Sequence, residues 1–154
     1  MDIKLLRKEA QIPTLGSAAA AGYDLYAALE PERDLNGVYM AGSMEIPPHE
    51  TRLIPTGIAL AIPAGYWGGI YARSGLASKK GLRPANCVGV IDADYRGEIF
   101  VALHNDTDYY HYIYNGDRIA QLVFHQCWHI DGFEQVEELD STDRGEGGFG
   151  STGK

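Results

Sequence analysis

The sequence predicts an all-β fold of the sandwich or barrel kind in a single domain. Apolar runs are short, and Gly, Pro, Asn and Asp separate them along the whole chain. A helical spacing of apolar residues is nearly absent, whereas short apolar runs bounded by turn residues are typical of strands. With 154 residues, the chain is long enough for one domain to bury a core without disulfides.

The expected strands follow the chain in order. Because proline cannot donate to a sheet ladder, the prolines between positions 47 and 63 mark strand ends or edges. The charged, glycine-bearing stretch 30–43 is expected to be an exposed loop. The segments expected to be strands are residues 3–7, 51–55, 57–62, 66–71 and 118–124.

Residues 72–81 are the one segment expected to be helical, with Ser74 as N-cap and Gly81 just beyond the last turn. A helix start offers unpaired amides that favour phosphate, and Arg73 adds a bidentate fork beside it. The alternative is a capped surface helix with a solvated arginine.

Charge and cysteine usage exclude several classes of protein. The chain carries 13 Lys+Arg against 21 Asp+Glu, a formal charge of −8, which argues against an electrostatic nucleic-acid binder. Cys87 and Cys127 lack metal-ligand spacing, and the first residues contain no apolar signal region. No apolar run approaches the roughly 20 residues that span a bilayer. We therefore expect an intracellular, cytoplasmic protein with no membrane partner.

The stretch 89–99 is the centre of the predicted site. An apolar run ends at Asp92, turns, and resumes as a second apolar run, which predicts a β-hairpin. A carboxylate fixed where a strand enters a turn suits a positioned general base. The alternative is that Asp92 and Asp94 only satisfy turn backbone.

Two further polar side chains and the tail are candidates with open alternatives. Asp24 lies in a glycine-containing turn and either caps it or contacts a metal or water. Gln121 lies in an apolar run, so it is either a core hydrogen-bonding residue or a ligand contact. The glycine-rich tail is either an inert terminus or a lid, in which Arg144 contributes charge and Phe149 a stacking face.

Five stretches stand in a fixed order: residues 21–25, 73–77, 89–97, 116–121 and 144–153. Together they resemble the five-motif signature of the homotrimeric dUTP diphosphatases. The resemblance implies a distorted jelly-roll-like β-barrel or sandwich over residues 1–140 and a flexible C-terminal arm over residues 141–154 that closes over the active site. It also implies a homotrimer with three shared active sites and Mg²⁺-dependent hydrolysis of dUTP to dUMP and pyrophosphate. That reaction limits uracil incorporation into DNA and supplies dUMP for dTMP synthesis.

The resemblance also implies roles for individual residues. Asp92 is the general base, Tyr95 packs against the deoxyribose, and Asp24 acts near the metal through water. The uracil edge is read by Asn86 and by the backbone around Gly89, Val90, Ile91 and Phe100. The phosphates are held by Arg73, Ser74, Gly75 and Gln121. The arm contributes Arg144, Phe149, Gly150 and Ser151.

Two competing functions remain open at this point. A dCTP deaminase shares the fold but needs a glutamate at the base, and Glu98 is the only glutamate in the predicted hairpin, where strand periodicity leaves its direction unsettled. A binding or signalling protein would keep the nucleotide site and act through a partner surface. The stretch 30–43 and the tyrosine-rich stretch 109–114 are the candidates for such a surface.

Overall fold

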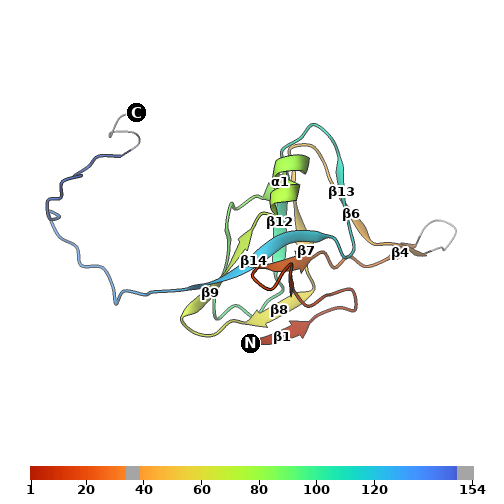
Figure 1. Ribbon diagram of the computed structural model, residues 1–154, viewed down its shortest axis with the longest axis horizontal. Coiled ribbons are helices and arrows are strands. Elements are labelled where there is room, and N and C mark those ends of the chain that lie inside the picture. Colours follow the sequence, from red (N-terminus) through yellow and green to blue (C-terminus); the bar gives the residue numbers. More distant parts are fainter. Residues whose placement is uncertain (34–38, 149–154) are drawn as a thin grey trace.

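The computed structural model describes residues 1–33 and 39–148. Three expected site residues, Phe149, Gly150 and Ser151, lie outside the described residues. The elements are β1 (Asp2–Leu5), β2 (Thr14–Leu15), β3 (Tyr23–Tyr26), β4 (Glu32–Arg33), β5 (Tyr39–Met40), β6 (Ser43–Ile46), β7 (Thr51–Pro55), β8 (Ile58–Ala61), β9 (Tyr66–Tyr71), α1 (Ser74–Lys80), β10 (Leu82–Pro84), β11 (Gly89–Ile91), β12 (Phe100–Asn105), β13 (His111–Tyr114) and β14 (Arg118–Gln126) (Figure 1).

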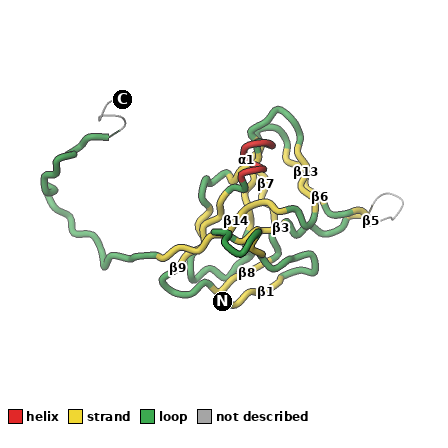
Figure 2. The backbone as a smooth tube through the Cα atoms, in the orientation of Figure 1, coloured by secondary structure: helices red, strands yellow, loops and turns green. Residues whose placement is uncertain are grey.

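Antiparallel pairing arranges these strands into several small sheets. The largest has five strands in the order β11-β9-β14-β3-β2, and a second has the order β10-β12-β7. Three two-stranded pairs complete the fold: β1 with β8, β13 with β6, and β4 with β5. The all-β prediction with one short helix is confirmed for the described residues, and the open sheets fit the jelly-roll-like description (Figure 2).

The core lies between the five-stranded and three-stranded sheets. Leu25 and Leu103 have no exposed surface, and Ile54, Ile119 and Leu122 are at most 1% exposed. Along β12, alternate side chains are buried, as expected for a strand with one face on the core. The alternation of residues along this strand thus places every second side chain in the core.

Most of the predicted strands agree with the structure. Segments 51–55 and 66–71 match β7 and β9, and segment 118–124 continues to Gln126. Segments 3–7 and 57–62 correspond to the shorter strands β1 and β8. Strand boundaries are thus the least accurate part of the prediction.

The helix start differs from the prediction by one residue. The helix begins at Ser74 itself, and the N-cap is Arg73, in extended conformation, whose side chain makes no capping hydrogen bond. Ser74 as N-cap is therefore wrong. Gly81 adopts a left-handed φ of 62° and donates its N–H to the carbonyl of Leu76, which confirms it as the residue that ends the helix.

The predicted β-hairpin over residues 89–103 is also wrong. Strand β11 pairs with β9, whereas β12 pairs with β10 and β7 in another sheet. The cause lies at Ile99, which is buried and donates its amide to the carbonyl of Ile58 at 2.9 Å. The carbonyl of Ile99 accepts the hydroxyl of Thr56 at 2.6 Å. The chain therefore joins a distant strand before it could pair with β11.

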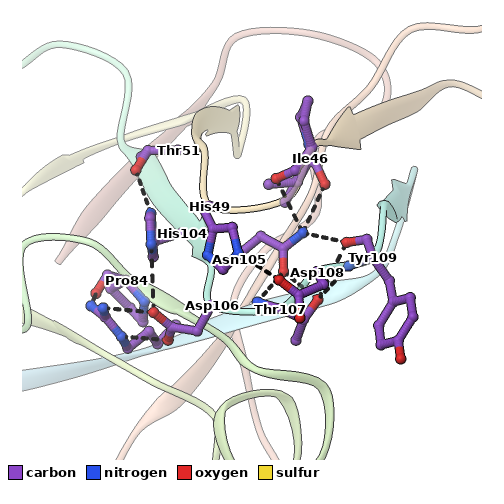
Figure 3. A network of polar contacts seen from close by, with 12 residues as sticks. Ile46, His49, Thr51, Pro84, His104, Asn105, Asp106, Thr107, Asp108 and Tyr109 are labelled. Atoms are coloured by element: carbon purple, nitrogen blue, oxygen red, sulfur yellow. Dashed lines mark hydrogen bonds and ion pairs between the residues drawn. The ribbon is translucent and has the colours of Figure 1, made fainter.

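A buried amide organises the end of β12 (Figure 3). Asn105 is fully buried, and its Nδ2 donates to the carbonyls of Ile46, Pro47 and Tyr109 at 3.1, 3.1 and 2.6 Å. Its Oδ1 accepts the amide and the hydroxyl of Thr107 at 2.9 and 2.7 Å. One side chain thus joins β12, β6 and the loop that leads to β13.

The chain leaves the body after β14 (Figure 1). Large apolar side chains on this segment are exposed: Trp128, Ile130, Phe133, Val136 and Leu139. Exposed apolar residues in such number are typical of an interaction surface. In the part of the chain that the structure describes, no helix is long and apolar enough to cross a membrane.

Candidate active site

An ion-pair cluster around the buried Asp24 connects three of the motifs. Asp24 in β3 is 6% exposed. Its Oδ1 accepts Nε of Arg73 at 2.9 Å, and its Oδ2 accepts Nη1 of Arg118 at 3.1 Å. Arg73 also donates Nη1 to the carbonyl of Arg118 at 3.2 Å. One carboxylate therefore fixes two guanidinium groups, so neither arginine has the freedom of a solvated surface side chain.

Gln121 and the start of α1 lie beside this cluster. Gln121 in β14 pairs in register with Asp24 on one side and Tyr71 on the other, which places the three side chains on one face of the sheet. Gln121 is half-buried, and no described residue hydrogen-bonds to its side chain. Ser74 and Gly75 are the first two residues of the helix, so their amides have no intrahelical acceptor. We call Arg73, Ser74, Gly75 and Gln121 the phosphate half-site.

The turn after β11 holds Asp92 in a closed loop. The amide of Tyr95 donates to the carbonyl of Asp92 at 3.2 Å, and Arg96 Nη1 donates to the carbonyl of Ala93 at 2.6 Å. Tyr95 donates its hydroxyl to the carbonyl of Glu98 at 2.9 Å. A Cβ at Gly97 would collide with the end of the Tyr95 ring, so a larger residue there would displace this ring from its present position.

The carboxylates of Asp92 and Asp94 in this turn have no hydrogen-bond partner among the described residues. Asp92 is exposed, and within the described residues no donor contacts its carboxylate. The turn is closed by the Tyr95 and Arg96 contacts instead, so the structure does not use Asp92 as a side-chain cap. A fixed backbone with an open carboxylate is the geometry that a general base needs.

The residues expected to read the base surround this turn. Asn86 and Val90 are exposed, Gly89 is buried, Ile91 is half-buried and Phe100 is 42% exposed. A Cβ at Gly89 would lie 3.0 Å from Asn86 Nδ2, so glycine permits the close approach of that amide. The amide of Ala85 donates to the carbonyl of Ala102 at 2.7 Å and closes the base of the loop. We call the Asp92 turn together with this loop the base half-site.

One chain does not bring the two half-sites together. Ile91 pairs with Gly68 in antiparallel register, so Asp92 lies opposite Trp67. Arg73 follows Trp67 by six residues, two residues past the end of β9. At about 3.3 Å per residue this is a separation of roughly 20 Å. The described part of the arm contains Arg144, whose Nε donates to the carbonyl of Gly147 at 2.8 Å, and it extends away from the body (Figure 1).

Comparison with known proteins gives the family. The family model described as dUTPase matches residues 8–153. The chain belongs to the dUTPase family. A relative from Candida albicans named deoxyuridine 5'-triphosphate nucleotidohydrolase is 46% identical over 155 residues, which cover 100% of this chain and 88% of the relative.

Solved dUTPase structures have the same fold. A mutant dUTPase of Staphylococcus bacteriophage 80alpha with dUpNHpp has a TM-score of 0.81 and 31% identity, covering 99% of this chain and 98% of that one. A mutant dUTPase from phage phi11 of S. aureus has a TM-score of 0.76 and 27% identity, covering 91% of this chain and 98% of that one. That structure is described as revealing the coordination of a structural Mg(II) ion.

Two residues of this dUTPase were not assigned from the sequence. Arg118 lies inside the fourth motif, yet only its contact with Asp24, 94 positions away, shows that it belongs to the cluster. Glu98 accepts Nη2 of Arg7 at 2.5 Å and the amide of Gly57 at 2.8 Å. Its carboxylate therefore contacts Arg7 and Gly57 and not the base half-site. Strand periodicity alone had left the direction of this side chain open.

The residues of this dUTPase that the structure describes do not form a metal cage. Among the described residues, no group of three His, Cys, Asp or Glu side chains could hold a metal ion. Both oxygens of Asp24, the residue expected near the metal, contact arginines. Because Mg²⁺ usually keeps several waters and binds substrate phosphates plus one or two carboxylates, this arrangement fits an ion that arrives with the nucleotide.

Proposed function

We propose that this member of the dUTPase family hydrolyses dUTP to dUMP and pyrophosphate by attack of a water on the α-phosphorus, with Asp92 as the general base. The supporting observation is the open carboxylate of Asp92 on a turn closed by Tyr95 and Arg96. Asp92 orients the water and accepts its proton. A general base supplies about 10²–10⁴-fold. Most of the acceleration therefore comes from positioning and charge stabilisation.

The phosphate half-site supplies that positioning. Arg73 is fixed by Asp24 before any ligand binds, so little reorganisation is needed when phosphate charge develops. Gln121 and the amides of Ser74 and Gly75 provide further donors at the same place. These groups hold the triphosphate in line for attack.

The base half-site accounts for selectivity. Asn86 and the backbone of Gly89, Val90, Ile91 and Phe100 would pair with the uracil edge. A close fit at C5 rejects the thymine methyl, and cytosine would leave buried amides unpaired. The Tyr95 ring, held against Gly97, packs on the deoxyribose and leaves no room for a 2′-hydroxyl.

A homotrimer with shared active sites resolves the separation within one chain. The roughly 20 Å between Asp92 and Arg73 is too long for one nucleotide to place its α-phosphate at both, so the base half-site of one copy would face the phosphate half-site of another. The exposed apolar residues of the segment after β14 suit docking on a neighbouring copy. The arm, residues 141–154, would close over the site with Arg144, Phe149, Gly150 and Ser151.

Mg²⁺ is proposed as the metal of the reaction. When bound, it neutralises phosphate charge and helps to orient the triphosphate. Asp24 would act on it only through water, because its own oxygens are engaged by Arg73 and Arg118. We propose dUTP as the ligand of this site and propose no nucleic-acid partner. We propose an intracellular, cytoplasmic setting, since Cys87 and Cys127 are free thiols.

The first experiment is pyrophosphate release from dUTP, dTTP, dCTP and UTP, with Mg²⁺ and with chelator. We expect release from dUTP alone, with Mg²⁺. Asp92→Asn should keep nucleotide binding and lose most turnover, while the neighbouring Asp94→Asn serves as the matched control. Near-normal turnover of Asp92→Asn would remove its role as base. Ammonia release from dCTP would support a deaminase, against which the engaged Glu98 argues.

A further inference from the structure

A polar cavity of about 230 Å³ is lined by residues of α1 and β13 and by Arg73 of the phosphate half-site. The two elements lie near each other in Figure 1. Its lining includes the apolar residues Leu82 and Ile113 and the two arginines Arg73 and Arg118. At roughly 30 Å³ per water molecule, the cavity has room for a small hydrated anion. The roles proposed above use Arg73 but leave the rest of this cavity without a function.

The charges around the cavity are mainly positive. The basic side chains that line it are Arg73, Lys80, His111 and Arg118. Two carboxylates lie near these groups. Asp117 lines the cavity, and Asp24 is paired with both arginines. No described acidic side chain forms an ion pair with Lys80. In a chain with a formal charge of −8, three cationic side chains around one cavity are a local reversal of sign.

Both arginines also keep hydrogen-bond donors for a ligand. A guanidinium has five N–H donors in a fixed fork. Arg73 uses Nε and Nη1, and Arg118 uses Nη1, in the contacts with Asp24 and with backbone. Their remaining donors are available, and this fork geometry matches phosphate oxygens.

Two of the cations that line the cavity come from opposite ends of α1. Arg73 immediately precedes α1 and Lys80 is its last residue, so their Cα atoms are roughly 10 Å apart along the helix axis. His111 lines the same cavity from β13. Separated cations favour an elongated polyanion over a single phosphate group.

We propose that this cavity binds inorganic pyrophosphate, with Lys80 and His111 holding the end remote from Arg73. The proposal rests on the proposed function, because hydrolysis at the α-phosphorus releases pyrophosphate beside Arg73. Pyrophosphate in the cavity keeps Arg73 engaged and competes with the next triphosphate. The site therefore makes pyrophosphate a competitive inhibitor against dUTP.

The test is calorimetric titration of the intact protein with pyrophosphate in the absence of nucleotide, with orthophosphate in parallel. We expect saturable pyrophosphate binding and weaker orthophosphate binding. Lys80→Gln should weaken pyrophosphate binding about tenfold, as loss of one charge-assisted contact does. Lys79→Gln is the matched control, because Lys79 is the adjacent exposed lysine of the same helix and does not line the cavity. It should leave the affinity unchanged.

Turnover of dUTP by the same variants separates the two proposals. Lys80→Gln should keep the turnover of wild type and lose most of the inhibition by added pyrophosphate. Normal dUTP turnover without pyrophosphate binding would overturn the cavity proposal and leave the proposed function intact. Equal loss of affinity in both lysine variants, or none in Lys80→Gln, would also overturn it. Binding that depends on Lys80 in a chain that does not hydrolyse dUTP would support the cavity alone.

Discussion

Replacement of Asp24 by Asn tests whether this residue acts by holding arginines or by acting near a metal. Asn keeps the shape of the side chain but removes its charge. Both arginines then lose a charged acceptor, and one of them faces an NH2 group that cannot accept its hydrogen bond. A hydrogen bond to a charged group is worth about 1.5–3 kcal/mol. Because the arginine side chains are 26% and 50% exposed, solvent screens part of it, and we take about 1.5 kcal/mol.

That energy corresponds to about a tenfold weaker affinity for the triphosphate. The assay is the dissociation constant of the dUTP analogue dUpNHpp, measured by calorimetry with Mg²⁺ and again with chelator. If Asp24 acts by holding Arg73 and Arg118, the affinity falls about tenfold in both conditions. A loss seen only with Mg²⁺ would refute this reasoning and assign Asp24 to the metal.

The matched control for this prediction is Asp117→Asn. Asp117 also lines the cavity beside Arg118, and its Oδ2 accepts the amide of Tyr114 at 2.9 Å, a contact that Asn can keep. The variant therefore removes one nearby negative charge without releasing an arginine. We expect its affinity for the analogue to stay the same or to rise slightly. A tenfold loss in this control would mean that local charge, and not arginine placement, decides the binding.

Three other predictions concern stability and assembly. Asn105→Ala removes a buried amide whose two N–H donors and oxygen face five polar partners. It should lower the free energy of unfolding by about 3 kcal/mol in urea titrations at fixed protein concentration, and a loss below about 1 kcal/mol would contradict the role of this amide. The hydrogen bond from Arg83 lowers the pKa of Asp106, so this pair stabilises the fold above the unfolded pKa and loses that contribution as pH falls through the folded pKa. The difference in urea midpoint between wild type and Asp106→Asn should accordingly shrink below about pH 4, and a constant difference would exclude this linkage. Removal of the residues after Asp143 should leave fold and assembly intact while turnover falls sharply, so loss of the oligomer in light scattering would contradict the lid assignment.

The strands that the sequence predicts correctly are those with proline or glycine residues at or near their ends. Strands β7 and β9 lie between proline or glycine residues and carry apolar runs, so neighbouring residues are enough to define them. The hairpin prediction failed because it too used only neighbouring residues. The amide of Ile99 bonds to Ile58, 41 positions earlier, and tertiary burial overrides the local turn pattern.

The site shows the same limit. The motif order found Asp92 and Arg73, but the contacts of Arg73 and Arg118 with Asp24 join residues 49 and 94 positions apart. A single sequence does not show which of its acids meets which arginine, so Asp24 was expected near a metal and the cluster with Arg118 was missed. The resemblance implied active sites shared between subunits, and the separation of roughly 20 Å between Asp92 and Arg73 within one chain agrees with that expectation.

The charge of the cluster bears on how an acidic protein binds a triphosphate. Two guanidinium groups and one carboxylate leave a single net positive charge beside the phosphate half-site. The Asp24 carboxylate fixes the positions of Arg73 and Arg118, but it also neutralises one of their two positive charges. A triphosphate carries several negative charges, so this cluster cannot balance them alone. The remaining charge has to come from an ion bound with the nucleotide and from Arg144 of the arm, which explains why affinity should depend on both Mg²⁺ and arm closure while the arginine geometry depends on neither.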